Sequence, residues 1–389
     1  MEKKSKNTTK NVKNEFENFK KLKDVKSVKS ASAKKTAKKN VVQEDDGTLK
    51  IGIVGIGSVG APIAVLLASK GYDVEITKKN TDDLMIDNRV NIEINGAFGD
   101  KSYLVKSVQN NNFTSKKDVI IMCTQAYSTA GALTEVKNYL KPNGVVVSLQ
   151  NVLNINDVLK VVPKERYVAL LIDWTATRIA MNHIVVLRTG EMHVGVFDKK
   201  AEIYLPIIQQ LLNAIQPTIV HNDMLQFIAS RFVLTCTMSS VLAITGHNLK
   251  KTLTSKTAKR LIVGTINEML RVFSAYNVDV PPYRGSLDYY KFTKRGLAGK
   301  IYRGKMFYRF VCQNGDMCSS ILRALENKKR TELDSMCNRI VEMANERGIS
   351  VPFNGTIAKF LYDVEEGRET IFMENLTNPI FTKLRIDWR

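Results

Sequence analysis

The chain has 389 residues, and 44% of them are hydrophobic, which allows a large core and two or three domains. The formal net charge is +20, but residues 1–43 hold 14 lysines against four acidic residues, so half of the excess lies in one short segment. This distribution argues against a specific nucleic-acid partner, and no run approaches the ~20 apolar residues of a membrane span.

Residues 1–48 are rich in lysine, asparagine and serine, and we expect them to be largely disordered because they lack the apolar content of a core. Apolar residues from Val12 to Val28 recur every three or four positions, a pattern that would allow a basic amphipathic helix against an acidic partner or a membrane surface. We favour the simpler interpretation, a solvated arm. The segment resembles neither a cleavable signal nor an Arg-rich transit peptide, so we expect a cytoplasmic protein.

The cysteines and histidines show no spacing typical of a metal site or a disulfide framework. An odd number of cysteines without a secretory signal indicates reduced thiols in a cytosol-like compartment. The histidines are scattered and none pairs with another at ligand spacing, so we expect no structural metal. These residues are Cys123, Cys236, Cys312, Cys318, Cys337, His183, His193, His221 and His247.

The first expected strand and helix are joined by a glycine-rich turn. Ile51–Val54 is an apolar run suited to a buried parallel strand, and Pro62–Lys70 continues as a helix. Between them Gly55, Gly57 and Gly60 have the spacing G-x-G-x-x-G. The strand–turn–helix context is typical of a dinucleotide site, although a purely structural glycine turn remains the alternative.

Each glycine of this turn has an expected role. Gly55 permits the tight turn, Gly57 lets the backbone approach a pyrophosphate, and Gly60 lets helix and strand pack closely. The helix N-terminus then presents free N–H groups and the positive end of its dipole to phosphate. The predicted phosphate-binding residues are Gly55, Gly57, Ser58, Val59 and Gly60.

The end of the second strand, Asp73–Thr77, bears on the choice between NAD and NADP. An NAD site needs a carboxylate there, ~20 residues after the glycines, to bind the ribose 2′-hydroxyl. The strand is followed instead by Lys78 and Lys79, whose ammonium groups suit a 2′-phosphate, while Glu75 lies mid-strand between apolar residues. We therefore expect NADP(H) as the cofactor. Alternatively, the two lysines only form a solvated turn.

Further strands complete an α/β domain, which we assign to residues 49–220. Apolar runs predict strands at Val119–Cys123, Val145–Leu149, Tyr167–Ile172, Ile184–Leu187 and Met192–Val196, with a helix at Ala132–Leu140 and a turn at residues 141–144. Ligands of such sheets bind beyond the carboxyl ends of the strands. This places Thr124, Gln125, Gln150 and Asn151 at the expected site, unless they are only polar loop residues.

The pattern becomes helical from about Asp223, with apolar residues at three- and four-residue intervals. Residues 283–313 interrupt it with a Tyr-, Lys- and Arg-rich stretch that we interpret as an insertion. We assign residues 221–370 to a helical domain and residues 371–389 to a C-terminal extension. The predicted helices are Phe227–Ile244, Ala258–Tyr276, Asp316–Leu325, Arg330–Arg347 and one that begins near Thr356.

Five motifs occur in a fixed order between about Leu49 and Lys359. They are G-I-G-S-V-G-A at Gly55–Ala61, L-Q-N at Leu149–Asn151, G-E-M-H-V-G at Gly190–Gly195, S-S-I-L-R-A-L-E-N-K-K-R-T-E-L-D at Ser319–Asp334 and G-I-S-V-P at Gly348–Pro352. Together they resemble the 2-dehydropantoate 2-reductases, or ketopantoate reductases. The resemblance implies an α/β Rossmann-type domain followed by an all-α domain like the C-terminal domain of 6-phosphogluconate dehydrogenase. It also implies hydride transfer from NADPH to the ketone of a 2-keto acid in a cleft between the domains.

By position in these motifs, the resemblance implies roles for individual residues. Glu332 matches the family's catalytic glutamate, and Ser320 matches the serine that binds the substrate carboxylate. Asn151 matches an asparagine that contacts both cofactor and substrate. Lys79 stands at the basic residue for the 2′-phosphate, and Gln125 stands where many members have a lysine near the nicotinamide.

The first helix of the second domain departs from the family pattern. Arg231 stands where the family has its catalytic lysine, and Thr235 and Ser239 replace two asparagines that follow at four-residue intervals. Met317 likewise stands where an asparagine is expected. The spacing still places the three helix residues on one face. We therefore assign Arg231 to catalysis, and Thr235 and Ser239 to substrate binding.

The substitution of arginine for lysine changes the expected chemistry. Hydride delivery to a ketone creates an alkoxide, which needs a cationic or proton-donating partner. Lysine can be both, whereas arginine stays protonated. Arg231 would then stabilise the oxyanion or bind the substrate carboxylate with two hydrogen bonds, and the proton would come from Glu332 or from a water held by Thr235. Alternatively, Arg231 only pairs with an acid at the start of the helix.

Three hypotheses remain open from the sequence. The first is an NADPH-dependent reductase of ketopantoate or a related 2-keto acid, acting as a monomer or homodimer. The second is an NADP-binding scaffold or sensor of the same fold, because the nucleotide half matches the family while the substrate half is altered. The third is another 2-hydroxy or 3-hydroxy acid dehydrogenase of similar architecture.

Overall fold

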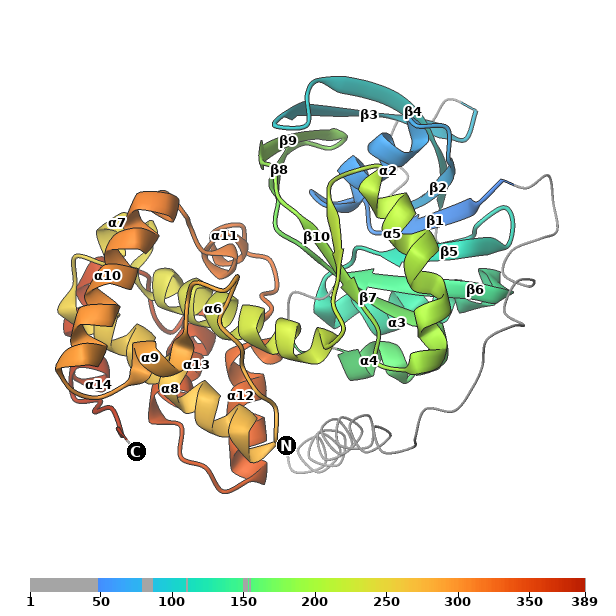
Figure 1. The fold of residues 1–389 in the computed structure, drawn as a ribbon. Coiled ribbons are helices and arrows are strands. Elements are labelled where there is room, and N and C mark those ends of the chain that lie inside the picture. The colour runs from blue at the N-terminus through green and yellow to red at the C-terminus, as the bar shows by residue number, and fades with distance from the viewer. Residues whose placement is uncertain (1–47, 79–86, 110, 150–152, 154, 389) are drawn as a thin grey trace, which may run out of the picture. The chain divides into compact units, whose positions relative to one another are not determined.

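The computed structural model describes residues 48–78, 87–109, 111–149, 153 and 155–388 (Figure 1). These residues form two compact units. The sheet unit comprises the described residues up to Met224 except Leu153, and the helical unit comprises Leu153 and the residues from Leu225 onward.

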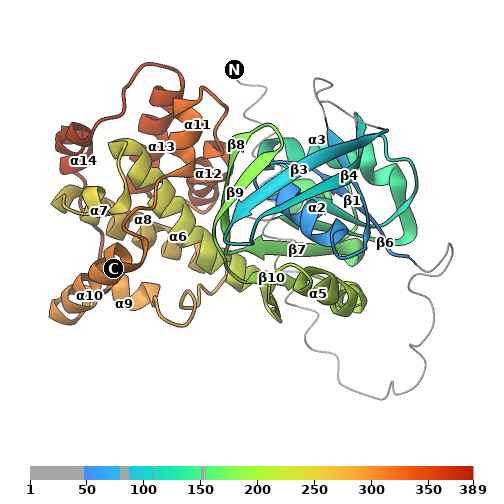
Figure 2. The same cartoon turned by 90° about the horizontal axis from the view of Figure 1, so that it is seen from above.

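The described part of the sheet unit contains an 11-stranded sheet in the order β11-β10-β7-β6-β5-β1-β2-β4-β3-β9-β8 (Figures 1 and 2). The strands are β1 (Lys50–Val54), β2 (Asp73–Lys78), β3 (Arg89–Gly96), β4 (Lys101–Gln109), β5 (Lys117–Met122), β6 (Leu140–Leu149), β7 (Tyr167–Ile172), β8 (Thr175–Ala180), β9 (His183–Arg188), β10 (Met192–Gly195) and β11 (Thr218–Val220). Strands β4, β2, β1, β5, β6 and β7 are adjacent and parallel, in the order of a Rossmann-type domain. Their carboxyl ends therefore meet at one edge.

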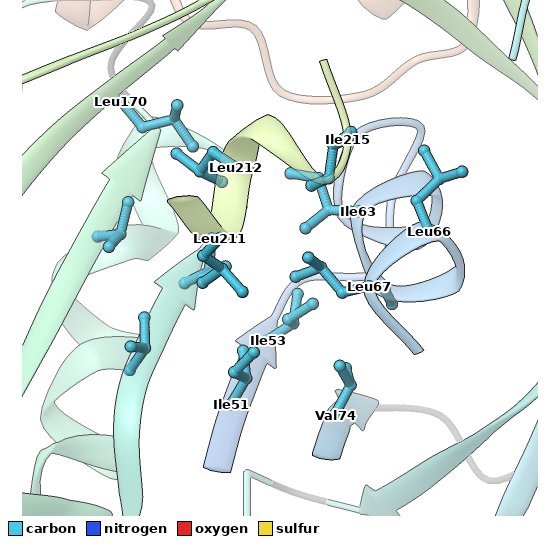
Figure 3. Close-up of a cluster of buried hydrophobic side chains, with 14 of the residues drawn as sticks. Ile51, Ile53, Ile63, Leu66, Leu67, Val74, Leu170, Leu211, Leu212 and Ile215 are labelled. Atoms are coloured by element: carbon cyan, nitrogen blue, oxygen red, sulfur yellow. The ribbon is translucent and has the colours of Figure 1, made fainter. Parts of the chain in front are cut away.

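The helix after the glycine-rich turn, α2 (Gly60–Ala68), is buried over its whole length. A helix that is apolar all round suits this position, because α2 packs on β1 and β2 and also contacts β3 and β4, which curve over it (Figure 1). Figure 3 shows Ile63 and Leu67 of α2 beside Ile53 of β1 and side chains of α5 (Leu205–Asn213). This core holds the start of α2 at the carboxyl edge of the sheet.

Strands β3, β4 and β8 are not predicted from the sequence. Burial alternates along β3, as in a strand with one face in the core, so β3 lacks the continuous apolar run of the central strands. Strand β8 is mostly exposed and gives no apolar signal at all. All three lie beyond β2 in the sheet, and β3 and β4 are the ones that pack on α2.

Two predicted boundaries between β5 and β6 are wrong. The helix predicted at Ala132–Leu140 lies earlier, at α3 (Ala126–Val136), and the predicted turn at residues 141–144 belongs to β6. Along β6 the pairing with β5 jumps from Leu140 to Val145, so residues 141–144 form a bulge inside the strand. Helix α3 and the short α4 (Ile155–Leu159) cover the face of the sheet opposite α2 (Figure 1).

The helical unit begins at Leu225, the second residue of α6 (Met224–Thr245). By length and composition α6 alone among the described helices could cross a membrane. However, 72% of its apolar 18-residue stretch is buried within the protein, as in the core helix of a folded domain. The other helices are α7 (Leu249–Thr252), α8 (Lys256–Ala275), α9 (Tyr289–Thr293), α10 (Leu297–Asn314), α11 (Ser320–Glu326), α12 (Cys337–Glu346), α13 (Pro352–Glu365) and α14 (Pro379–Thr382). Short 3-10 turns of the helical unit are η5 (Leu333–Ser335) and η6 (Met373–Thr377), and those of the sheet unit are η2 (Lys137–Tyr139), η3 (Lys164–Arg166) and η4 (Lys199–Tyr204).

The helix predicted at Arg330–Arg347 is wrong in its first half, because α12 begins only at Cys337. The backbone N–H and the hydroxyl of Thr331 donate to the carboxylate of Glu365 in α13, at 2.9 and 3.1 Å. These bonds hold the segment before α12 in a non-helical conformation. Glu332, the next residue, therefore lies outside a helix. The helix predicted at Asp316–Leu325 also begins later, as α11, and the predicted insertion at 283–313 folds into α9 and α10.

The C-terminal extension packs on the helical unit. Phe381 of α14 is fully buried, and its ring centroid lies 5.3 Å from that of Phe360 in α13. The guanidinium of Arg260 in α8 donates to the carbonyl oxygens of Phe381 and Thr382 at 3.2 and 3.1 Å. The extension is thus attached both by apolar burial and by hydrogen bonds to its backbone.

Candidate active site

Two glycines of the turn after β1 occupy positions where no side chain fits. Gly55 has φ +92°, and a Cβ there would lie 2.9 Å from the carbonyl carbon of Cys123. A Cβ at Gly60 would lie 2.0 Å from the carbonyl oxygen of Gly55. The backbone is therefore packed tightly where α2 starts against the ends of β1 and β5.

Gly57 differs from its neighbours, because a Cβ there would meet no atom within 4 Å. The turn continues through Ser58 and Val59 into α2, whose N-terminus has no side-chain cap and no acidic residue in its first turn. The N–H groups and the dipole of the helix therefore lack a competing anion from their own helix. Open space at Gly57 beside such a helix start fits the pyrophosphate of a dinucleotide.

Arg178 of β8 is a cation beside this turn that was not predicted. Its Nη2 donates a hydrogen bond to the carbonyl oxygen of Ile56, between the first two glycines of the motif. Burial lowers the pKa of the Arg178 guanidinium, although arginine remains charged at neutral pH. The two partners are 122 residues apart in the chain, and no motif marks their contact.

The end of β2 is the predicted site of the 2′-phosphate. Lys78 is the last residue of β2, and Lys79 lies outside the described residues. Glu75 lies mid-strand as predicted, where its carboxylate is buried and forms an ion pair with Lys117 Nζ at 2.6 Å. This carboxylate is thus engaged within the core of the sheet unit.

The predicted ligand edge includes the residues that follow β5 and β6. Thr124 comes shortly after β5, and its Oγ1 lies 3.0 Å from Oγ1 of Thr129 in α3. Gln125 is exposed and immediately precedes α3. Thr124 and Gln125 therefore lie at the carboxyl edge that also carries the glycine-rich turn. Gln150 and Asn151 lie outside the described residues.

In the helical unit, the predicted substrate residues of α6 share one face, as expected from their spacing. Arg231, Thr235 and Ser239 are half-buried, whereas their neighbours Phe232 and Cys236 are 1% and 0% exposed. The accessible side of this apolar helix therefore carries a polar stripe.

The start of α11 is hydrogen-bonded to Ser239, the last residue of this polar stripe. Ser319 Oγ donates to the carbonyl oxygen of Ser239 at 2.6 Å and accepts from the Leu322 N–H at 3.2 Å. Ser319 is buried and acts as the helix cap, so the adjacent Ser320 is the exposed serine of the pair. Ser320 is therefore one residue away from the hydrogen bond that joins Ser319 to Ser239.

Tyr283 was not predicted as a site residue, yet it contacts the arginine of the stripe. Arg231 Nη1 donates to the Tyr283 hydroxyl at 3.1 Å. The same segment is tied to the preceding residue of α6, because Ser230 Oγ donates to the Pro281 carbonyl at 2.8 Å and the Tyr289 hydroxyl donates to the Ser230 carbonyl at 2.5 Å. Part of the predicted insertion therefore surrounds Arg231. No spacing in the sequence indicates the contact between Arg231 and Tyr283.

Glu332 is half-buried, and the Thr331–Glu365 hydrogen bonds fix the backbone that precedes it. The predicted residues of the helical unit are thus held by three elements: the stripe by α6, Ser320 by the start of α11, and Glu332 by a segment anchored to α13.

The sheet order and the open glycine-rich turn define a Rossmann-type dinucleotide-binding domain, here followed by a helical domain. The chain belongs to the ketopantoate reductase family. The family model of ketopantoate reductase PanE/ApbA matches residues 51–199, and the model of its C-terminal domain matches residues 223–365.

Individual relatives agree with this assignment. The 2-dehydropantoate 2-reductase of Aquifex aeolicus is 22% identical over 324 residues, which cover 80% of this chain and 96% of the relative. A PanE/ApbA family ketopantoate reductase from Ralstonia eutropha has a structure that matches with a TM-score of 0.70 at 18% identity, over 83% of this chain and 100% of that one. D-mandelate dehydrogenase, solved with NADH and anilino(oxo)acetate, matches with a TM-score of 0.71 at 17% identity, over 83% and 100% of the two chains. These structural matches show a shared fold.

Proposed function

We propose that this protein reduces 2-keto acids to 2-hydroxy acids with NADPH, and that ketopantoate is its substrate. The observation that carries the proposal is the open space at Gly57 beside the uncapped start of α2, since a dinucleotide pyrophosphate fits such a turn. Membership of the ketopantoate reductase family supports the reaction type. NADPH, when bound, supplies the hydride that reduces the keto carbon.

The sheet unit would bind the cofactor. Backbone N–H groups of the glycine-rich turn would bind the pyrophosphate, and the Arg178 guanidinium beside Ile56 would offset part of its charge. Lys78 and Lys79 would bind the 2′-phosphate, while Thr124, Gln125 and Asn151 would lie toward the nicotinamide.

The two lysines provide a direct test of cofactor choice. The unmodified protein should bind NADPH more tightly than NADH. Replacing Lys78 and Lys79 by alanine should weaken NADPH binding by about 1.5–3 kcal/mol for each charged hydrogen bond lost, and should leave NADH binding unchanged. Fluorescence titration of both cofactors measures this, with the exposed pair Lys199 and Lys200 as matched alanine controls. Equal affinities in the unmodified protein would contradict NADP specificity.

The helical unit would bind the substrate, and the Arg231–Tyr283 pair would replace the family's single lysine. Arg231 donates to the phenolic oxygen of Tyr283 at 3.1 Å, so the guanidinium lies directly beside the phenol. The guanidinium would stabilise the phenolate that forms when Tyr283 gives its proton to the substrate alkoxide. Ser320, Thr235 and Ser239 would bind the polar groups of the substrate, and Glu332 would orient it by accepting hydrogen bonds.

Substitutions at this pair distinguish its two members. Tyr283→Phe keeps the ring but removes the proton, so the turnover number should fall about 100-fold while the Kd for NADPH stays constant. Arg231→Lys restores a tunable amine, and turnover of ketopantoate should hold or rise. The exposed Tyr290→Phe serves as the control. If Tyr283→Phe retains full turnover, the proton comes from another group and this assignment is wrong.

The reaction itself is tested by NADPH consumption across a panel of 2-keto acids that includes ketopantoate and the phenyl-substituted 2-keto acid whose reduction gives mandelate. Turnover of ketopantoate supports the proposal. Turnover of the phenyl-substituted acid alone would mean that the proposed reaction is right and that ketopantoate is not the substrate. The replacement of the family's lysine by Arg231 favours a second candidate, an NADP-binding scaffold or sensor. NADPH binding without turnover of any keto acid would establish that alternative.

A further inference from the structure

Two neighbouring strands of the sheet unit bring together three potential metal ligands that are apart in the sequence. Strand β10 pairs antiparallel with β7, with Met192 opposite Ile172. Just beyond this pair, the Asp173 N–H donates to the Glu191 carbonyl oxygen at 2.9 Å. The strand pairing therefore sets Asp173 against Glu191, and His193 follows two residues later on β10.

The side chains of Asp173, Glu191 and His193 also point toward one common position. One carboxylate oxygen from each of Asp173 and Glu191 and one ring nitrogen of His193 all lie within 4.8 Å of one another. His193 Nε2 lies 3.0 Å from Asp173 Oδ2, and both side chains are withdrawn from water, at 3% and 4% exposed. Glu191 is exposed, so the group is open to solvent on one side.

His221, which follows β11, approaches the other nitrogen of His193. Its Nε2 lies 3.0 Å from His193 Nδ1, and the two ring centroids are 5.1 Å apart. The ring of His193 thus has a polar partner at each nitrogen. Metal-ligating histidines usually have such a partner at the nitrogen that does not bind the metal, because it sets the tautomer and the orientation of the ring.

We propose that Asp173, Glu191 and Nε2 of His193 form a binding site for a divalent transition metal ion such as Mn²⁺ or Zn²⁺, with His221 positioning His193. Two carboxylates balance the charge of a divalent ion, and a mixed oxygen and imidazole donor set suits these metals. Binding requires the tautomer of neutral His193 that carries its one ring proton on Nδ1, so that proton moves from Nε2 to Nδ1 by exchange with solvent and none is released overall. The Nδ1–H then donates to His221 Nε2, 3.0 Å away. Water completes the coordination on the exposed Glu191 side. This site does not depend on the proposed reductase reaction.

Mn²⁺ is the best probe, because it prefers oxygen and imidazole donors and binds cysteine thiolates poorly. Titration of the full chain, followed by loss of the electron paramagnetic resonance signal of free Mn²⁺, should show one site per chain. Glu191→Gln should weaken Mn²⁺ binding by at least about tenfold, and His221→Ala should weaken it by about 10–100-fold. Glu202→Gln, at another exposed glutamate of the same unit, should leave it unchanged.

Two results would overturn the site. The first is no Mn²⁺ binding by the unmodified protein, in which case Asp173, His193 and His221 are only a hydrogen-bonded cluster. The second is equal binding by the unmodified protein and Glu191→Gln, which would place the ion elsewhere. Because Glu191 is exposed, its substitution should not disturb folding. Thermal unfolding adds an independent measurement, since Mn²⁺ at one concentration should raise the Tm of the unmodified protein more than that of Glu191→Gln.

Discussion

Replacing Glu332 by glutamine should lower the turnover number by about 100-fold and leave the Kd for NADPH nearly unchanged. The carboxylate only accepts hydrogen bonds, whereas an amide presents a donor to one of the two positions, and misplacement of a bound substrate by about 1 Å can cost 10²-fold in rate. Cofactor binding should not change, because Glu332 belongs to the helical unit and the phosphate-binding turn belongs to the sheet unit.

Steady-state kinetics with the best keto acid of the panel and NADPH titration measure the two quantities separately. Glu366→Gln is a suitable control, since Glu366 follows α13 at the surface and is distant in sequence from the family motifs. If Glu332→Gln keeps the full turnover number, the residue is not part of the reaction, and its match to the family's glutamate has no functional meaning here.

Gly57→Ala should abolish most NADPH binding without destabilising the protein. A methyl group at this position meets no protein atom within 4 Å, so the folded chain can accommodate it. It would instead occupy the space proposed for the pyrophosphate and prevent one or two charged hydrogen bonds, each worth about 1.5–3 kcal/mol. We therefore expect a loss of about tenfold to 1,000-fold or more in affinity, with an unchanged Tm.

Gly131→Ala provides the matched control, because Gly131 of α3 belongs to the same unit and a Cβ there also has open space. It should leave NADPH binding unchanged and add about 0.5–1 kcal/mol of stability, as alanine does within a helix. Unweakened NADPH binding by Gly57→Ala would mean that the open space at the turn does not receive the pyrophosphate. Gly60→Ala is not equivalent, since its Cβ would collide with the Gly55 carbonyl oxygen at 2.0 Å and distort the turn itself.

The parts of this protein that the sequence predicts best depend on neighbours along the chain. The glycine-rich turn is visible because strand, turn and helix are contiguous, and the central strands are visible because burial on both faces requires continuous apolar runs. The face shared by Arg231, Thr235 and Ser239 follows from helical periodicity alone. Segments with weaker local signals were missed, including the alternating β3, the exposed β8 and the bulge at residues 141–144.

By itself, therefore, the sequence determined the Rossmann and helical domains, the family and the polar face of α6. Only the tertiary structure decided which residues from distant parts of the sequence contact the glycine-rich turn and α6. Arg178 reaches the carbonyl of Ile56 across 122 residues, and Tyr283 reaches Arg231 across 52. Strand register likewise sets Asp173 beside His193, a pairing that their spacing along the chain does not indicate. The physical reason is that these contacts depend on strand order, register and packing, which join positions that share no local periodicity.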